Sequence, residues 1–345
     1  MGTELGARLL TQVRPAVGFQ PVALAPFFHF DAHYYAAIMR YGYGPGPGSF
    51  PAPAYRVEFF PLYPYLAKAV GGTELGLLLI ANLAFFVALV VTFLIARKWL
   101  DRDRAHLALW LIALGPAAMF FSYPYSESLF LALSVLCFFL LDGHLWLLAG
   151  LAGAAAAMTR GAGVLLSLAF AGGFLRGAPR RVTALAALLP IGGLIAVGWV
   201  DQVQMGDPLG FLHAEVYWVP PSPRNPLFPI GVVGKAVLAA DPFRPEALAL
   251  PLLLVFAAGA IWVARRMPLS YGIYAIAMVL LAVRTGWYVH SFYSVARYLA
   301  VIFPCYFAFA TLLQPRRTLQ LAWLLLSAAI LVTYSALYGS GRFIG

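Results

Sequence analysis

The chain has 345 residues, of which 62% are hydrophobic and only 10% are charged, whereas about a quarter of the residues in an average soluble domain are charged. So few polar side chains could not cover a soluble protein of this length, which excludes a soluble domain and predicts an all-α polytopic membrane protein. The formal net charge of +10 does not indicate nucleic-acid binding, because the basic residues stand between apolar segments instead of forming a patch.

The first 30 residues predict a short interfacial helix near 5–13, followed by an apolar stretch at 15–30 that contains three prolines. Because a helix needs roughly 20 residues to cross a bilayer, the stretch is either a kinked first span or part of one. Residues 31–74 then form a polar, aromatic and proline-rich loop. Within it, Pro61 and Pro64 predict a rigid turn that enters an interfacial helix.

The rest of the chain predicts apolar helices joined by mostly short connections, in a single transmembrane domain of about 10–11 spans. We divide it into a bundle at 75–200, a second long outer loop at 201–245 and C-terminal spans at 246–338. The expected helices are 75–96, 105–121, 127–141, 145–158, 162–175, 182–200, 246–264, 269–283, 297–313 and 318–338.

Basic residues set the expected orientation, because cytoplasmic loops of membrane proteins are enriched in Lys and Arg. Placing the connection after 75–96 inside puts every basic doublet on that side: 97–98, 180–181, 265–266 and 316–317. Both long polar loops then face outward. The sequence therefore predicts a multi-pass cell-membrane protein whose active site lies on the non-cytoplasmic face.

Asp31 is the strongest candidate for chemistry, because it lies between an apolar run and a helix-like segment in FHFDAHYY. One interpretation is a helix N-cap. The other is a general base, partly desolvated at the membrane boundary, that takes a proton from a hydroxyl. The two roles are compatible.

Other residues of the two outer turns are candidates for substrate binding. In the first loop Arg56 and Glu58 are two positions apart, so an ion pair between them is the simpler interpretation. In FSYPYSESLF, Ser126 followed by Glu127 is typical of the start of a helix. The alternative is sugar recognition, for which the ring of Tyr125 and the carboxylate of Glu127 are suited. The candidates are His33, Tyr34, Arg56, Glu58, Tyr63, Tyr125 and Glu127.

Arg297, Arg160, Arg284 and His290 are candidates for binding a phosphate on the outer side. An arginine near the end of a span more often extends to lipid headgroups, which is the simpler interpretation of each. His29 and His33 are four residues apart, and a single pair at this spacing is a weak metal signal. We predict no metal site, and the absence of a glycine-rich phosphate loop gives no sign of a nucleotide cofactor.

Several segments together resemble the PIG-V-type mannosyltransferases. FDAHYYAAIMRYGY followed by FFPLYPYL resembles the first outer loop of that family, and SYPYSESLFLAL resembles its Ser-Glu-Ser helix start. AGLAGAAAAMTRGAGVLL, GDPLGFLHAEVYW and SVARYLAVIFP follow in the order of its later blocks, so the resemblance covers about 30–304. Phe30 stands where the family usually has tryptophan.

This resemblance implies a GT-C glycosyltransferase fold and an inverting transfer of mannose from a polyprenyl-phosphate donor to a lipid or glycan acceptor. The family's first-loop aspartate falls on Asp31, where a catalytic base is expected. The alternatives are a flippase or transporter of lipid-linked sugar, which should carry polar residues to the inner mouth as well, and a non-catalytic subunit of a glycosylation complex.

Overall fold

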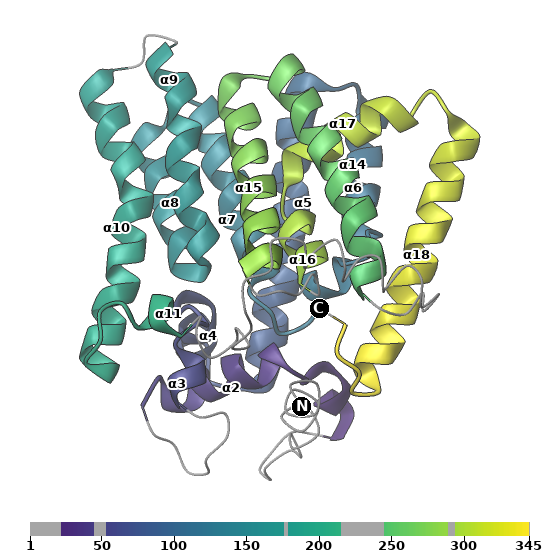
Figure 1. Cartoon of the computed structure of the whole chain (residues 1–345). Helices are drawn as coiled ribbons and strands as arrows, with labels where there is room; N and C mark the ends of the chain where they lie inside the picture. The colour runs from purple at the N-terminus through teal and green to yellow at the C-terminus, as the bar shows by residue number, and fades with distance from the viewer. Residues whose placement is uncertain (1–21, 45–52, 176–178, 215–244, 289–293, 345) are drawn as a thin grey trace.

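The computed structural model describes residues 22–44, 53–175, 179–214, 245–288 and 294–344. Within these ranges the chain is helical without strands, and its long helices stand side by side (Figure 1). The bundle helices are α5 (Glu74–Trp99), α6 (Arg102–Ala113), α7 (Glu127–Asp142), α8 (Trp146–Thr159), α10 (Arg180–Met205), α14 (Pro245–Arg266), α15 (Leu269–Tyr288), α17 (Phe303–Leu313) and α18 (Arg317–Gly339).

Four helices of the described ranges are long and apolar enough to cross a bilayer: α5, α10, the part of α14 from Leu248 to Arg266, and α18. Four shorter apolar helices accompany them, at Trp146–Thr159, Gly161–Gly173, Leu269–Thr285 and Phe303–Leu313. The all-α polytopic fold class is therefore confirmed. The predicted interfacial helix at 5–13 and the first part of the predicted stretch, 15–21, lie outside the described residues. Within the rest of the stretch, 22–27 is a 3-10 helix, η1 (Val22–Phe27).

Short helices lie across one end of the bundle and form the layer that carries the candidate base. They are η1, α2 (Asp31–Tyr41), α3 (Pro53–Arg56), α4 (Leu62–Ala69) and α11 (Gly210–His213), and Figure 1 shows them below the long helices. The helices predicted after Asp31 and after Pro61 are both present. Tyr63 anchors α4, because its buried hydroxyl donates to the carbonyl oxygen of Leu77 at 2.9 Å.

Three predicted helices are broken or tightened. The expected helix 105–121 ends at Ala113 and resumes as a 3-10 turn, η2 (Ala118–Phe121), because Pro116 cannot continue an α-helix. The expected helix 297–313 is split into α16 (Val295–Ala300) and α17, with a proline in the first turn of α17. The expected helix 162–175 is a 3-10 helix, η3 (Gly161–Phe170), followed by the short α9 (Ala171–Leu175).

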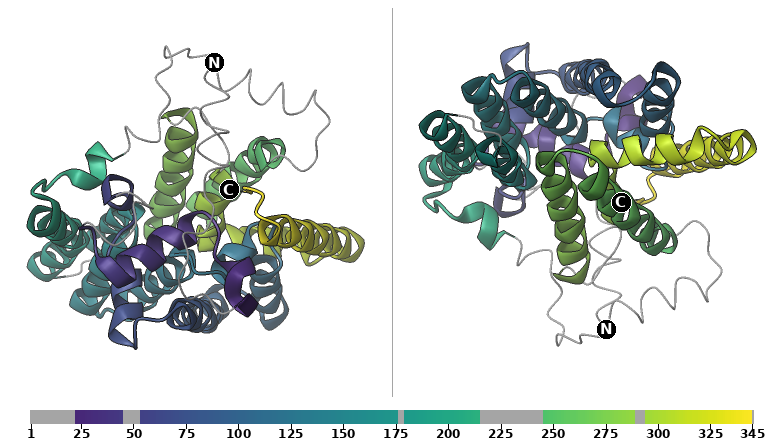
Figure 2. Two further views of the ribbon diagram at one scale, coloured as in Figure 1. Left: turned by 90° about the horizontal axis from the view of Figure 1, so that it is seen from below. Right: turned by 90° about the horizontal axis from the view of Figure 1, so that it is seen from above.

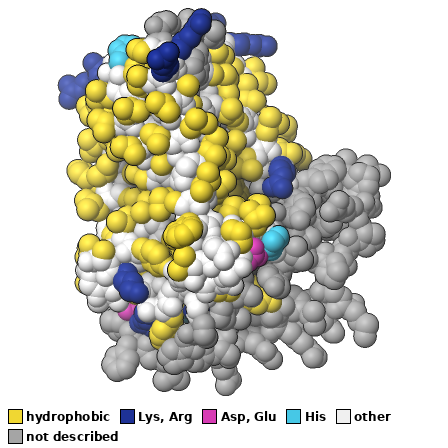
Figure 3. Space-filling view, turned by 90° about the vertical axis from the view of Figure 1, so that its left-hand side faces the viewer, with side chains coloured by type: hydrophobic (Ala, Val, Ile, Leu, Met, Phe, Trp, Pro, Cys, Tyr) yellow, Lys and Arg dark blue, Asp and Glu magenta, His cyan; other side chains and the backbone are white. Residues whose placement is uncertain are grey.

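The basic doublets gather at the end of the bundle opposite α2 and α4. Arg97 and Lys98 lie in the last turn of α5, and Arg265 and Arg266 in the last turn of α14. The space-filling view shows Lys and Arg side chains at the upper edge of a broad apolar band, and a few more lower down (Figure 3). The doublets 97–98 and 265–266 lie at the upper end.

Glycines bring α8 and α10 into close contact. A Cβ atom at Gly150 would lie 2.6 Å from the carbonyl oxygen of Ala186, and one at Gly153 would lie 2.8 Å from the ring of Pro190. A Cβ atom at Gly193 would overlap the backbone of Ala154. Small residues at such positions let helix backbones approach closely within a membrane.

We expect Gly193→Ala to lower the thermal stability of the protein in detergent, because the added methyl group forces α10 away from α8. Its neighbour Gly192 is the matched control, since nothing lies within 4 Å of a Cβ atom there. Gly192→Ala should be neutral or stabilising by up to about 1 kcal/mol, the helix-propensity gain over glycine. Equal melting temperatures of the two variants would show that this contact is not tight.

Candidate active site

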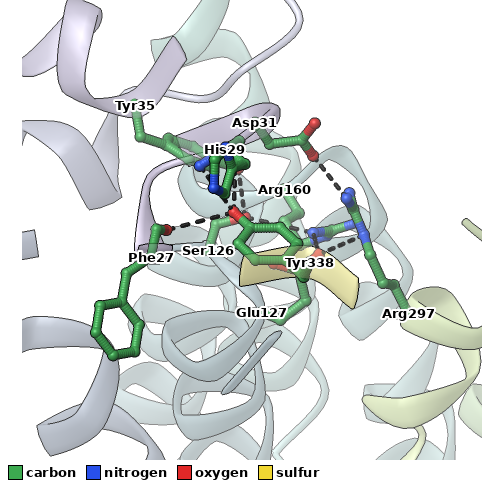
Figure 4. Close-up of polar contacts among 9 residues, drawn as sticks. All are labelled: Phe27, His29, Asp31, Tyr35, Ser126, Glu127, Arg160, Arg297 and Tyr338. Carbon is green, nitrogen blue, oxygen red and sulfur yellow. Dashed lines mark hydrogen bonds and ion pairs between the residues drawn. The ribbon is translucent and has the colours of Figure 1, made fainter. Parts of the chain in front are cut away.

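Four charged side chains from distant parts of the sequence meet where the short helices cover the bundle (Figure 4). Arg297 Nη1 lies 2.6 Å from Asp31 Oδ2, and Arg297 Nε lies 3.0 Å from Glu127 Oε1. Arg160 Nη1 lies 2.6 Å from the same Glu127 oxygen. The result is a continuous series of charges in the order Asp31, Arg297, Glu127, Arg160, with two positive and two negative members.

The cluster is largely withdrawn from solvent. The side chain of Glu127 is 1% exposed, and those of Arg297, Arg160 and Asp31 are 9%, 12% and 17% exposed. Removing a charge from water is costly unless an opposite charge lies against it, so the alternation of signs is what makes this burial tolerable. Asp31 is the most exposed member and is therefore the one most open to a substrate.

Aromatic rings complete the walls around the two arginines. The guanidinium of Arg297 lies 5.2 Å from the ring centres of both Phe120 and Tyr125, and that of Arg160 lies 5.1 Å from the ring centre of Tyr298. Rings at this distance attract a cation and exclude water from it. The rings therefore restrain the directions of both guanidinium groups.

The ends of helices bring these four residues together. Asp31 and Glu127 are the first residues of α2 and α7, and Arg160 is the residue at which the chain leaves α8 in an extended conformation. Arg297 lies in the short α16 before the chain turns into α17. Asp31 is thus not the N-cap of α2, a position held by Phe30, and its carboxylate contacts Arg297.

The environment of Asp31 sets its protonation. Burial raises the pKa of this carboxyl above the ordinary aspartate value, and the neighbouring Arg297 opposes that increase. The ring of His33, two residues further along α2, has its pKa lowered to about 4 by burial. His33 is therefore neutral at physiological pH.

The other candidates from the sequence occupy varied positions. Tyr125 belongs to the cluster, and Tyr34 stacks on Phe59 at a ring distance of 4.5 Å on the flank of α2. Arg56 is buried and donates to the backbone oxygen of Gly44 at 2.9 Å, so it fastens the end of α2.

The remaining candidates lie on other elements or beyond the described part of the chain. Glu58 is half-buried, and its charge acts on Tyr34 and Tyr298. Tyr63 is buried against α5, Arg284 is exposed on α15, and His290 is outside the described residues. Among the described residues no three His, Cys, Asp or Glu side chains are grouped to hold a metal ion.

Two contributors were not anticipated from the sequence. Tyr35 donates to the hydroxyl of Ser126 at 2.7 Å, and Ser126 lies 3.4 Å from Arg160 Nη1. Tyr338, near the end of the last helix, contacts the backbone of His29. No local pattern signals these contacts, because the partners are 91 and 309 positions apart.

Two solved structures resemble nearly the whole chain. ArnT from Cupriavidus metallidurans, bound to undecaprenyl phosphate, matches with a TM-score of 0.54 at 16% sequence identity, covering 95% of this chain and 63% of ArnT. The chain has the GT-C glycosyltransferase fold. An oligosaccharyltransferase from Archaeoglobus fulgidus, tethered with an acceptor peptide, gives a TM-score of 0.41 at 16% identity, covering 94% of this chain and 51% of the enzyme.

The likeness to ArnT shows the fold and leaves the substrates open, because the identity is low and this chain spans only 63% of the length of ArnT. No family model matches the sequence. No curated protein matches it either. The GT-C fold implied by the resemblance is thus confirmed, whereas the narrower PIG-V-type assignment stays a prediction.

We expect Glu127→Gln to destabilise the protein by about 3 kcal/mol, the cost of removing one partner from a buried ion pair, because it leaves two guanidinium groups with one carboxylate. Chemical or thermal unfolding in detergent measures this change. Asp207→Asn is the control, since that carboxylate is 40% exposed and pairs with an exposed His213. The control should leave stability nearly unchanged, and an equally small change in Glu127→Gln would contradict the role of Glu127.

Proposed function

We propose that the protein is a membrane glycosyltransferase that moves a sugar, most specifically mannose, from a polyprenyl-phosphate donor to an acceptor hydroxyl, with Asp31 as the general base. The observation that carries the proposal is the contact of Asp31 with Arg297 at 2.6 Å in a largely buried cluster, at the end of a GT-C bundle. The PIG-V-type resemblance of the surrounding segments supports mannose as the sugar and inversion as the stereochemical outcome.

Asp31 suits the task of a base in two respects. Its carboxylate is the most exposed member of the cluster, so an acceptor hydroxyl can approach it. Burial makes it more basic than a solvated aspartate, while Arg297 keeps its ionised form available. In the reaction the acceptor oxygen bonds to the anomeric carbon, its proton passes to Asp31, and the carbon–oxygen bond to the lipid phosphate breaks.

The two arginines suit the leaving phosphate. At rest their charges are balanced by Asp31 and Glu127. When Asp31 takes the proton of the acceptor, Arg297 loses the negative charge that faced it, at the moment when the departing phosphate gains one. A cation held in place by Glu127 and by aromatic rings can then stabilise that phosphate without reorganising. Arg160, paired with Glu127, adds a second positive charge nearby.

The lipid tail of the donor would reach the cluster from the apolar side of the bundle. A small apolar pocket adjoins the break after α6, and its wall includes Ala296, the neighbour of Arg297 in sequence. We propose that the tail passes on this side of the bundle, with the site opening sideways to the bilayer. The wall is formed by Ile112, Gly115, Pro116, Ala117, Ala118, Leu252, Phe256, Ala296, Ala300 and Tyr306.

The location of the basic doublets supports an outward-facing site. They lie at the end of the bundle opposite Asp31, which by the positive-inside rule is the cytoplasmic end. The site then faces away from the cytoplasm in a cell membrane. No nucleotide sugar is required on that side, because the lipid phosphate activates the sugar.

We expect Asp31→Asn to lower the turnover of polyprenyl-phosphate mannose at least about a hundredfold, because the amide cannot accept the proton. Release of polyprenyl phosphate by purified protein in detergent measures this loss. Asp207→Asn, the same chemical change at an exposed carboxylate of the same layer, should retain activity. Full activity of Asp31→Asn would rule out Asp31 as the base.

A wild-type protein that releases nothing from this donor, but moves intact lipid-linked sugar across a vesicle membrane, would favour the flippase alternative. A protein inactive in both assays that restores glycosylation to a purified partner complex would favour the non-catalytic subunit.

The pH dependence of the reaction should show an acidic limb. Asp31 must be ionised to accept a proton, and burial raises its pKa, so activity should be lost on acidification at a higher pH than a solvated aspartate would give. The measurement is the turnover of a polyprenyl-phosphate donor against pH. His33 should not contribute to the profile above pH 5, because its pKa is about 4; an acidic limb that disappears in His33→Gln would contradict this assignment.

A further inference from the structure

The turn that leads into α2 has an unusual backbone at Phe30. Its φ of 51° and ψ of −119° match the first central position of a type II′ turn, where glycine is normally found. The N–H of Ala32 donates to the carbonyl oxygen of His29 at 3.2 Å and closes this turn. Asp31 is the second central residue. A phenylalanine in this conformation is strained and persists only when its surroundings hold it there.

Tyr338 of α18 stabilises this turn through hydrogen bonds and ring contacts (Figure 4). Its hydroxyl donates to the carbonyl oxygen of His29 at 2.7 Å and accepts from the N–H of His29 at 3.2 Å. Its ring packs edge-on against Phe30 at 5.7 Å and against His29 at 5.5 Å. Tyr338 is 1% exposed, so water does not compete for these hydrogen bonds.

The position of α18 makes this contact distinctive. Figure 2 shows α18 at the edge of the bundle. Only 17% of the apolar stretch of this helix is buried within the protein. At the end that carries Tyr338, the helix meets η1 and η2. At this end of α18 the hydroxyl of Tyr338 connects the helix to the backbone of His29.

We propose that Tyr338 is a positioning residue for Asp31: it holds the turn 29–32 in its strained form and thereby directs the Asp31 carboxylate at Arg297. The inference rests on the proposed function in one respect, that Asp31 is the base. The proposal gives α18, the last helix of the described chain, a part in positioning the base. It does so through Tyr338, which acts on the turn and not on the substrate.

Loss of the hydroxyl has a defined consequence for Asp31. The turn can relax towards an unstrained conformation, which moves the carboxylate away from Arg297. The charged groups that act on Asp31 are Arg297 of α16, Arg160 after α8 and Glu127 of α7. Since Arg297 is the strongest of the influences that lower the pKa of Asp31, a weaker contact raises that pKa.

The experiment compares full-length wild type, Tyr338→Phe and the control Tyr334→Phe, which makes the same change one turn earlier on α18. With synthetic polyprenyl-phosphate mannose, we expect Tyr338→Phe to lower kcat about tenfold or more while the donor KM stays within about twofold. The acidic limb of its pH profile should move to higher pH. Tyr334→Phe should match wild type in all three measurements.

A second measurement does not depend on activity. Carbodiimide labels protonated carboxyl groups, so the pH midpoint of Asp31 labelling, followed by peptide mass spectrometry, reports its protonation directly. Tyr338→Phe should raise this midpoint relative to wild type and Tyr334→Phe. An unchanged midpoint together with unchanged kcat would overturn the positioning role, whereas a wild type that does not turn over this donor would contradict the proposed function alone.

A rescue variant separates positioning from loss of packing. Phe30→Gly removes the strain, because glycine adopts a positive φ without penalty. In the Tyr338→Phe background it should therefore recover at least about threefold of the lost kcat. A further loss of kcat would show that aromatic packing, and not the shape of the turn, is what Tyr338 provides.

Discussion

The burial of two arginines against two carboxylates is the interaction on which the candidate site depends. Glu127 contacts both guanidinium groups and is the least exposed of the four side chains. It therefore fixes the spacing between Arg160 and Arg297, and Arg297 in turn fixes Asp31. Because each charge is stabilised by the next, the cluster behaves as a unit in which no member is independent.

Interruptions of helices, more than the helices themselves, build the site. Arg160 lies where α8 stops, Glu127 lies where α7 starts, and Arg297 lies in the short helix before α17. A continuous apolar helix would carry such residues past one another at different depths in the bilayer. The breaks bring polar side chains to the border of the apolar band, where the cost of burying a charge is lower than at its centre.

Polar contacts also attach the layer of short helices to the bundle. The backbone N–H of Tyr43 donates to Gln204 near the end of α10 at 2.9 Å, and the fully buried Asp201 accepts from the backbone of Phe211 at 3.1 Å. The first of these contacts lies just after α2 and the contact of Tyr338 with His29 lies just before it, so α2 is held at both ends. The carboxylate of Asp31 is consequently presented by a supported helix instead of a free loop.

The sequence by itself determined the class of the protein, the approximate place of most helices, and Asp31 as the residue of interest, because apolar run length, basic doublets and a local motif are all readable along the chain. It also ranked Arg297 and Arg160 among the candidates. Only the tertiary structure decided that these arginines face Asp31 and Glu127, that Arg56 fastens backbone, and that Tyr338 holds the turn before α2. Those outcomes depend on contacts between residues 12 to 309 positions apart. Such contacts arise from the packing of whole segments, which leaves no trace in local sequence.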